Sequence, residues 1–101
     1  MMKAVVYWDN YEAKQRAEAL FDQILANYQF INVKPVKVTK QRHKWSAWFE
    51  NGDSWQCLAP CECIRGIKAN LVYIPYNIYG QMKERAIATA VAQPYHGVIY
   101  Y

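Results

Sequence analysis

A short apolar run that leads straight into an amphipathic helix is the feature that most constrains the fold of this chain. Lys3–Trp8 (KAVVYW) has no polar alternation, which is typical of a strand covered on both faces. A strand followed directly by a long helix indicates a crossover unit, right-handed if the next paired strand is parallel. The apolar positions of the helix recur at the spacing of one helical stripe. They are Ala17, Leu20, Phe21, Ile24, Leu25 and Tyr28.

The start of this helix is marked by polar residues that can cap it. Asp9 and Asn10 precede the periodic stretch, and Asp9 with Glu12 three residues later imitates a capping box. We therefore expect the helix to span about residues 11–28.

Two aromatic runs in the middle of the chain predict an antiparallel hairpin over about residues 44–58. Trp45–Phe49 and Ser54–Leu58 have strand-favouring compositions, and the segment between them contains Asn-Gly, the strongest short-range signal for a hairpin. Alternate residues of a hairpin face inward, so at least one of Trp48 and Trp55 is expected to lie in the core.

The C-terminal half predicts a strand, a helix and a further strand. Leu71–Ile74 is an apolar run typical of a strand buried in a parallel sheet. Asn77 can cap a helix over about residues 78–93, which Pro94 ends. Residues 97–101 have the β-branched and aromatic composition of a final strand.

These elements predict a single α/β domain over residues 1–101. Its central sheet is expected to be mostly parallel, with strands at about 3–8, 71–75 and 97–101, and the two helices make it a two-layer or three-layer domain. The chain is 53% hydrophobic, which is enough to build one core.

The absence of long apolar runs in the sequence bears on where the protein acts. No run approaches the roughly 18 residues of a membrane span, and the apolar start of the chain is too short for a signal sequence. We therefore expect no membrane partner and a location in the cytoplasm of the host cell.

The cysteines and histidines form no arrangement typical of a catalytic or metal site. An odd number of cysteines in a chain without a secretion signal favours reduced thiols over disulfides. Cys57, Cys61 and Cys63 with His43 or His96 could supply four zinc ligands. Their spacing is not the usual C-x-x-C pair, so packed thiols without metal are the preferred interpretation. No nucleophile has a recognisable base partner, so no catalytic residue is assigned.

A cluster of basic residues is the strongest functional signal. The net charge of the chain is +4, and no acidic residue interrupts the basic ones between positions 34 and 44. The residues are Lys34, Lys37, Lys40, Arg42 and Lys44. Such clustering is typical of a surface that binds nucleic acid or another polyanion. The alternative is a solvated edge strand, over about residues 36–40, that uses lysine to discourage aggregation.

Four pieces of the chain share their order with a known family. They are Lys3–Trp8 with its helix, the hairpin loop Phe49-Glu50-Asn51-Gly52-Asp53, Ile64-Arg65-Gly66 before Asn70–Ile74, and Ala92-Gln93-Pro94 before the last strand. This order resembles the central part of the ATPase domain of the phage terminase large subunit and of related helicase-like P-loop ATPases. The resemblance covers nearly the whole chain, and it implies a phage-encoded protein.

The departures from that family argue against ATP hydrolysis. The strand equivalent to Leu71–Ile74 ends there in acidic residues that hold magnesium and polarise water, whereas here Pro75 and Tyr76 follow. The chain also has no G-x-x-x-x-G-K-[ST] segment to cradle phosphates. We therefore expect a non-enzymatic protein without cofactors. A composite ATPase, completed by a second chain that supplies the phosphate loop, is the remote alternative.

The resemblance also implies a sheet order. The strands at 3–8, 71–75 and 97–101 would lie side by side and parallel, with the last of them at an open edge. Such an edge can pair with a second copy or a partner strand, which makes Tyr100 and Tyr101 candidate partner-binding residues.

Two functional hypotheses follow, from different classes. The first is a phage-type accessory protein that binds DNA through the basic cluster, with Trp45 on the hairpin and Arg65 and Lys68 on the loop after it. The second is a protein-binding module, an inhibitor of a host defence nuclease or a regulator of a packaging motor, that uses aromatic surface and the open sheet edge.

Overall fold

The computed structural model of this chain describes residues 2–8, 10–42, 44–58, 69–76 and 97–101. Its elements are β1 (Lys3–Tyr7), α1 (Tyr11–Phe30), β2 (Pro35–Lys40), β3 (Lys44–Phe49), β4 (Ser54–Leu58), β5 (Leu71–Ile74) and β6 (Gly97–Tyr100). The helix expected over about residues 78–93 lies outside the described residues.

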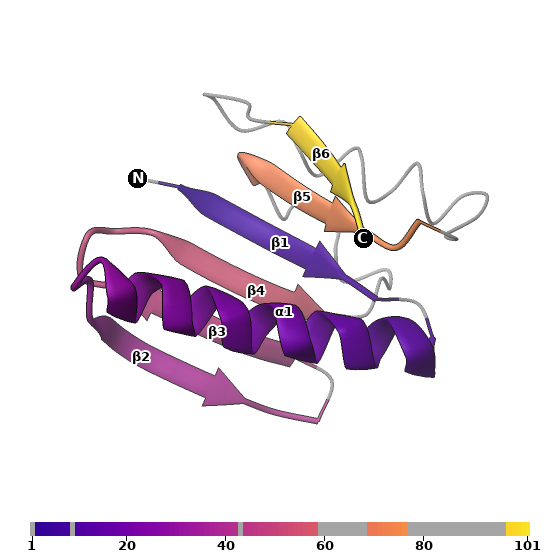
Figure 1. Cartoon of the computed structure of the whole chain (residues 1–101), viewed down its shortest axis with the longest axis horizontal. Coiled ribbons are helices and arrows are strands. Elements are labelled where there is room, and N and C mark those ends of the chain that lie inside the picture. The colour runs from indigo at the N-terminus through magenta and orange to yellow at the C-terminus, as the bar shows by residue number, and fades with distance from the viewer. Residues whose placement is uncertain (1, 9, 43, 59–68, 77–96) are drawn as a thin grey trace.

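The strands form one six-stranded sheet in the order β2-β3-β4-β1-β5-β6 (Figure 1). Strand β1 is parallel to both of its neighbours, β4 and β5, and β5 is parallel to β6. The prediction of an α/β domain is therefore confirmed, as is the side-by-side parallel arrangement of β1, β5 and β6. The sheet is mixed, however, because β3 runs antiparallel to both β2 and β4.

The connections explain why the sheet is mixed. Helix α1 carries the chain back along the sheet, which allows β1 and β4 to run parallel. The short loop between β3 and β4 can only reverse the chain, so this pair is antiparallel. The predicted hairpin over about 44–58 is confirmed, but it extends the central sheet at β4 and does not stand apart from it.

One face of the sheet is covered by α1, which lies across β3 and β4 in Figure 1. The predicted stripe of the helix is the buried one, with Leu20 and Leu25 at its partly exposed margins. On the sheet, this core contains alternate residues of β1, β3 and β4, including Val6, Trp45 and Trp55. The buried Trp55 confirms that a hairpin tryptophan faces inward.

The opposite face of the sheet is also buried around β1 and β5. Val5, Tyr7, Val72 and Ile74 are each at most 2% exposed. Residues of both parities along β1 are therefore covered, as the apolar run from Lys3 to Trp8 predicted. No helix in the described part of the chain is long and apolar enough to cross a bilayer.

Helix α1 begins at the predicted residue and ends later than predicted. Asn10, one of the two predicted capping residues, is the N-cap, because its side-chain Oδ1 accepts a hydrogen bond from the Ala13 amide at 2.8 Å. The helix extends to Phe30, two residues beyond the prediction. It ends in a Schellman motif, in which Asn32 adopts a φ of 61° and the Val33 amide donates to the Tyr28 carbonyl.

The loop between β3 and β4 does not form the type of turn that its Asn-Gly pair suggests. Only Gly52 has a positive φ, of 91°, so this is not the two-residue turn in which both central residues are left-handed. The Asn51 side chain instead accepts a hydrogen bond from the Asp53 amide at 3.0 Å. This side-chain contact adds to the backbone hydrogen bonds that close the turn, from the Gly52 amide to the Phe49 carbonyl and from the Phe49 amide to the Asp53 carbonyl.

We predict that Phe21→Ala lowers the free energy of unfolding by about 3–5 kcal/mol, because it removes a ring from the centre of the α1 core. Phe21 is 1% exposed, whereas Phe30, on the same helix, is 88% exposed. The matched control Phe30→Ala should change the free energy by less than about 0.5 kcal/mol. Urea denaturation measures both, and equal effects would contradict the described packing.

Candidate nucleic-acid interface

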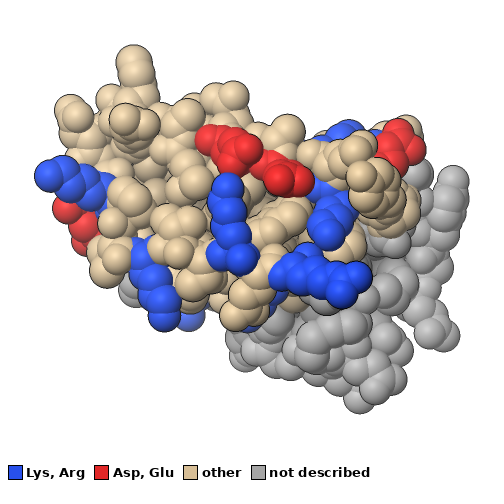
Figure 2. Space-filling view, turned by 90° about the horizontal axis from the view of Figure 1, so that it is seen from below, with Lys and Arg blue, Asp and Glu red and all other residues tan. Residues whose placement is uncertain are grey.

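Strand β2 is an edge of the sheet, and the basic residues follow it and the turn into β3. All members of the predicted basic cluster are exposed. Figure 2 looks at this edge and shows blue lysine and arginine side chains spread along it, with few acidic ones among them. We call the set Lys34, Lys37, Lys40, Arg42 and Lys44 the basic edge.

The register of β2 and β3 divides the basic edge between the two faces of the sheet. Lys37 lies opposite Trp48, and Lys40 lies opposite Trp45. Directly paired residues share a face, so Lys37 lies on the face away from α1 and Lys40 lies on the helix side. Lys44 has the same parity as Trp48 and therefore joins Lys37.

The two faces differ in how far their positive charge is neutralised. On the helix side, the Lys40 ammonium lies 3.5 Å from the Asp22 carboxylate, and both side chains are exposed. On the other face, the Lys37 ammonium lies over the Trp48 ring, 5.6 Å from its centroid. A ring neutralises no charge, so Lys37 keeps its full charge for an anionic partner.

Trp45 is not part of this surface, which corrects the prediction that it contacts nucleic acid. Its side chain is 7% exposed. Its ring centroid lies 6.4 Å from that of Trp8 and 6.3 Å from that of Phe21. The cause is the alternation of β3, which points Trp45 into the core and leaves Trp48 half-buried on the other face. Arg65 and Lys68 lie outside the described residues.

A hydrogen-bonded cluster that the sequence did not reveal holds the hairpin against the helix. The Tyr28 hydroxyl donates to Asp53 Oδ2 at 2.7 Å and accepts from the Trp55 indole at 3.1 Å. Asp53 Oδ1 accepts from the Met2 amide at 2.8 Å. Asp53 therefore joins α1, the residue before β1 and the loop between β3 and β4. The one sequence signal for this role of Asp53 is its position directly after Asn51-Gly52 in the hairpin loop.

The same contacts shift the pKa values of the Asp53 carboxyl and the Tyr28 hydroxyl. Burial alone would raise the pKa of Asp53, but the hydrogen bonds from Tyr28, the Met2 amide and Asn51 outweigh it and lower the pKa. Burial, together with the hydrogen bond to Asp53, raises the pKa of Tyr28 to about 12. The pair is therefore an ionised carboxylate and a neutral phenol near pH 7, an arrangement that supports structure and does not supply a general base.

A hollow of about 610 Å³ lies between the second half of α1 and β2. Asp22, Gln29 and Lys34 contribute polar groups to a wall that also contains Leu25 and Val38. This hollow borders the basic edge, but the side chains that line it include no pair of a nucleophile and a base.

The described residues contain no cluster of side chains suited to holding a metal ion. Within the ranges given above, no group of three or more His, Cys, Asp or Glu side chains gathers at one point. Cys57 is fully buried, and burial raises the pKa of its thiol to about 12. Because the thiolate is the metal ligand, such a thiol is a poor one. Cys61, Cys63, His43 and His96 lie outside the described residues.

The other edge of the sheet is β6, as the predicted order required. Tyr100 is 48% exposed there. Tyr101 is half-buried, its amide donates to the Ile74 carbonyl at 2.9 Å, and its hydroxyl donates to the Tyr7 carbonyl. Tyr101 therefore ties the end of the chain to the sheet, and Tyr100 is the more accessible of the two predicted partner-binding residues.

Comparisons with protein-family models, with curated proteins and with solved structures find no match to this chain. The resemblance to the terminase ATPase domain therefore stays a prediction.

We predict that Asp53→Asn destabilises the protein by roughly 1–3 kcal/mol at pH 7, because an ionised acceptor of several hydrogen bonds is lost. The folded-state pKa of Asp53 lies below its usual 3.8, so the contribution is present above that value and is lost as the pH falls through the folded-state pKa. The difference between variant and wild type should therefore shrink below about pH 4.

Denaturation curves at pH 7 and pH 3 measure this difference. The control Asp22→Asn removes an exposed carboxylate whose partner is Lys40. It should cost less than about 1 kcal/mol at either pH. A penalty for Asp53→Asn that is the same at both pH values would contradict the assigned role of its charge.

Proposed function

We propose that this chain is a non-catalytic, phage-type accessory protein that binds the phosphate backbone of DNA along the basic edge. The observation that carries the proposal is the alignment of five exposed cations along one edge of the sheet. Clustering of positive charge on one surface is the usual electrostatic feature of such proteins.

The dimensions of the edge suit a polyanion. The six residues of β2 rise about 20 Å at the usual spacing of a strand. Duplex DNA carries on the order of 12 negative charges over that length. Several of the five cations can therefore lie within reach of separate phosphates at once.

The geometry favours contacts to phosphates over contacts to bases. The tryptophans of the hairpin are buried or half-buried, and Lys37 already covers the Trp48 ring. Little aromatic face is free to stack on an unpaired base, which single-strand binders require. Lysine and arginine side chains on an open edge position a backbone without reading sequence.

We predict that Lys37→Glu with Lys44→Glu weakens binding to a 20-base-pair duplex at least tenfold. Both residues lie on the face whose charge no described acidic group offsets. If each contacts one phosphate, the slope of log affinity against log salt should become shallower by about 2, since each contact contributes about 0.9. Fluorescence anisotropy between 50 and 200 mM salt measures both quantities.

The control for this experiment is Lys3→Glu with Lys14→Glu, which changes the net charge by the same amount. These residues lie on β1 and α1, away from the basic edge. The control should retain the affinity within about threefold, with a slope of the wild-type value. Equal losses in the two double variants, or a wild-type affinity independent of salt, would refute a local interface.

A second candidate function is supported by the opposite edge. Ile99 and Tyr100 of β6 are 41% and 48% exposed, on a strand that pairs on one side only with the strands that the structure describes. We propose as the alternative that β6 pairs with a partner strand, either in a homodimer or on a protein that handles nucleic acid. Native mass spectrometry at high concentration tests the dimer, and a strict monomer would contradict it.

The proposed descent from a packaging ATPase is consistent with the parallel neighbours β1, β5 and β6, which the resemblance implies. Under this proposal the chain acts in the cytoplasm of the host cell, where phage DNA and its motor are found.

A further inference from the structure

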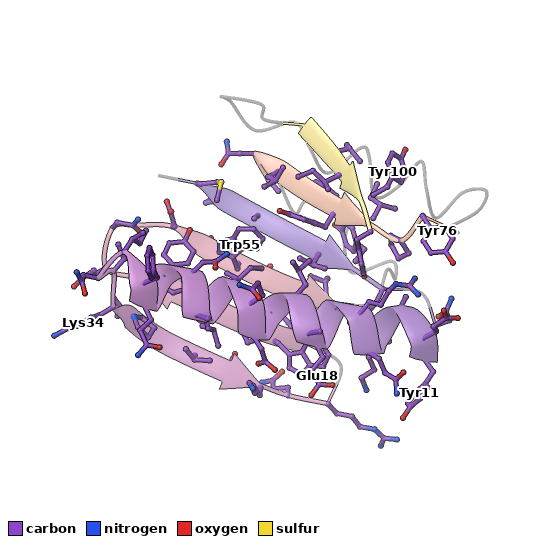
Figure 3. All side chains as sticks on the ribbon, viewed as in Figure 1. Tyr11, Glu18, Lys34, Trp55, Tyr76 and Tyr100 are labelled. Atoms are coloured by element: carbon purple, nitrogen blue, oxygen red, sulfur yellow. The ribbon has the colours of Figure 1, made fainter. Side chains whose placement is uncertain are left out.

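The carboxyl ends of β1, β5 and β6 meet at one end of the sheet, because these strands are parallel neighbours. Helix α1 starts at this end, Tyr76 lies two residues after the end of β5, and Tyr101 directly follows β6. Figure 3 shows Tyr76 and Tyr11 at the same end of the molecule. Arg16, on the second turn of α1, places its guanidinium against the ring of Tyr76. Figure 3 shows Tyr76 far along the sheet from Lys34.

The guanidinium of Arg16 is held by three neighbours. Its Nη1 donates to Glu12 Oε1 at 3.1 Å. Its central carbon lies 5.1 Å from the centroid of the Tyr76 ring and 5.9 Å from that of Tyr101. Tyr101 is itself held by its hydrogen bonds to Tyr7 and Ile74. The position of the cation is therefore largely fixed before any ligand arrives.

Two N–H donors of this guanidinium have no hydrogen-bond acceptor among the described residues. Nε and Nη2 are buried, and no group among the described residues accepts a hydrogen bond from either. A buried donor without an acceptor costs free energy, and a charged donor costs more, so such an atom calls for an explanation. These two N–H groups lie in the guanidinium plane along one edge of the group, where they form the fork that matches two oxygens of a carboxylate or phosphate.

We propose that Arg16 binds the oxyanion of a small ligand, a phosphate or a carboxylate, through Nε and Nη2. The contact with Glu12 occupies Nη1 and leaves the fork available. The tyrosine rings lie against the guanidinium, an arrangement in which aromatic faces stabilise the charge while in-plane donors continue to bind oxygen. This site goes beyond the proposed DNA interface and shares no residue with it.

Because Nε and Nη2 are buried, a ligand reaches them only if a neighbouring side chain moves, and of the two rings against the guanidinium Tyr76 is the more exposed one. Tyr76 is 67% exposed, so rotation of its side chain disturbs little packing. Tyr101, in contrast, is half-buried and hydrogen-bonded. The ligand therefore enters from the Tyr76 side and meets Arg16 against the fixed wall of Tyr101.

The order of the strands supports a ligand site at this end. From β1 the chain passes through α1 to the β2–β4 side of the sheet, and it later reaches β5 on the other side of β1. The strand order thus reverses at β1. In open α/β sheets, ligands bind outside the carboxyl ends of strands at such a point.

The direct test follows the ¹⁵N-labelled Arg16 Nε–H signal during titration of the wild-type protein with sodium phosphate or sodium acetate. Ionic strength is held constant with chloride, at pH 7.5. We expect this signal to shift and saturate, while that of Arg42, an exposed arginine on the basic edge, moves only slightly and without saturation. Saturation by phosphate alone assigns a phosphorylated ligand, and saturation by both anions assigns a carboxylate or phosphate ligand.

Two variants separate this site from general charge effects. Glu12→Gln keeps a hydrogen-bonding oxygen for Nη1 but removes a negative charge, so it should tighten anion binding by about fivefold, the ratio that one unit charge at about 4 Å produces in water. Arg16→Lys keeps the charge but removes the fork together with the Nε–H signal, so this variant is followed by the backbone amide signals of Ala17 and Tyr76. These amide signals should shift and saturate in the wild type and should not saturate in the variant. Lys37→Glu with Lys44→Glu should leave the Arg16 titration unchanged even if it abolishes DNA binding.

The proposal is overturned if the Arg16 signal in the wild type does not saturate with either anion, or if it moves in parallel with that of Arg42. This readout needs only the wild-type protein, so a variant that fails to fold does not affect it. Loss of DNA binding leaves the Arg16 result intact, because the two sites are measured by different signals.

Discussion

Helix α1 packs its apolar stripe across β3 and β4, and the placement of the basic edge depends on that contact. The stripe carries Phe21 and Tyr28 into a core with Trp45 and Trp55. Once these residues are buried, the alternation of β3 directs Trp48 to the other face. The pairing of β2 with β3 then divides the basic edge between the two faces.

Hydrogen bonds around Asp53 give this packing a fixed register. The stacking of Tyr28 on Phe49, with ring centroids 3.7 Å apart, brings the helix to the hairpin without choosing one orientation. The hydrogen bonds from Tyr28 and from the Met2 amide to the Asp53 carboxylate fix a single orientation of the helix on the hairpin. Since directional bonds to a charged acceptor fix geometry more strongly than apolar contact, the basic edge is held at a defined place relative to β1.

The molecule thus carries positive charge in two different settings. On the basic edge the cations are exposed and surrounded by solvent, which suits a long polyanion and weak, salt-dependent contacts. At the other end, Arg16 is largely fixed between rings and an ionic partner, with its remaining donors buried. A fixed, desolvated fork suits one small anion, because few degrees of freedom are lost when it binds.

The sequence by itself determined the elements whose signals are local. The apolar run of β1 and the stripe of α1 were predicted because burial repeats with the period of each element, and the hairpin was predicted from its turn residues. Tertiary structure decided that β4 lies beside β1, that Trp45 is internal, and that Asp53 and Arg16 meet partners far along the chain. Those outcomes depend on pairing between strands and on side chains distant in sequence. A local period shows which residues of a strand share a face, but it does not encode which of the two faces α1 covers or which neighbour a residue will have.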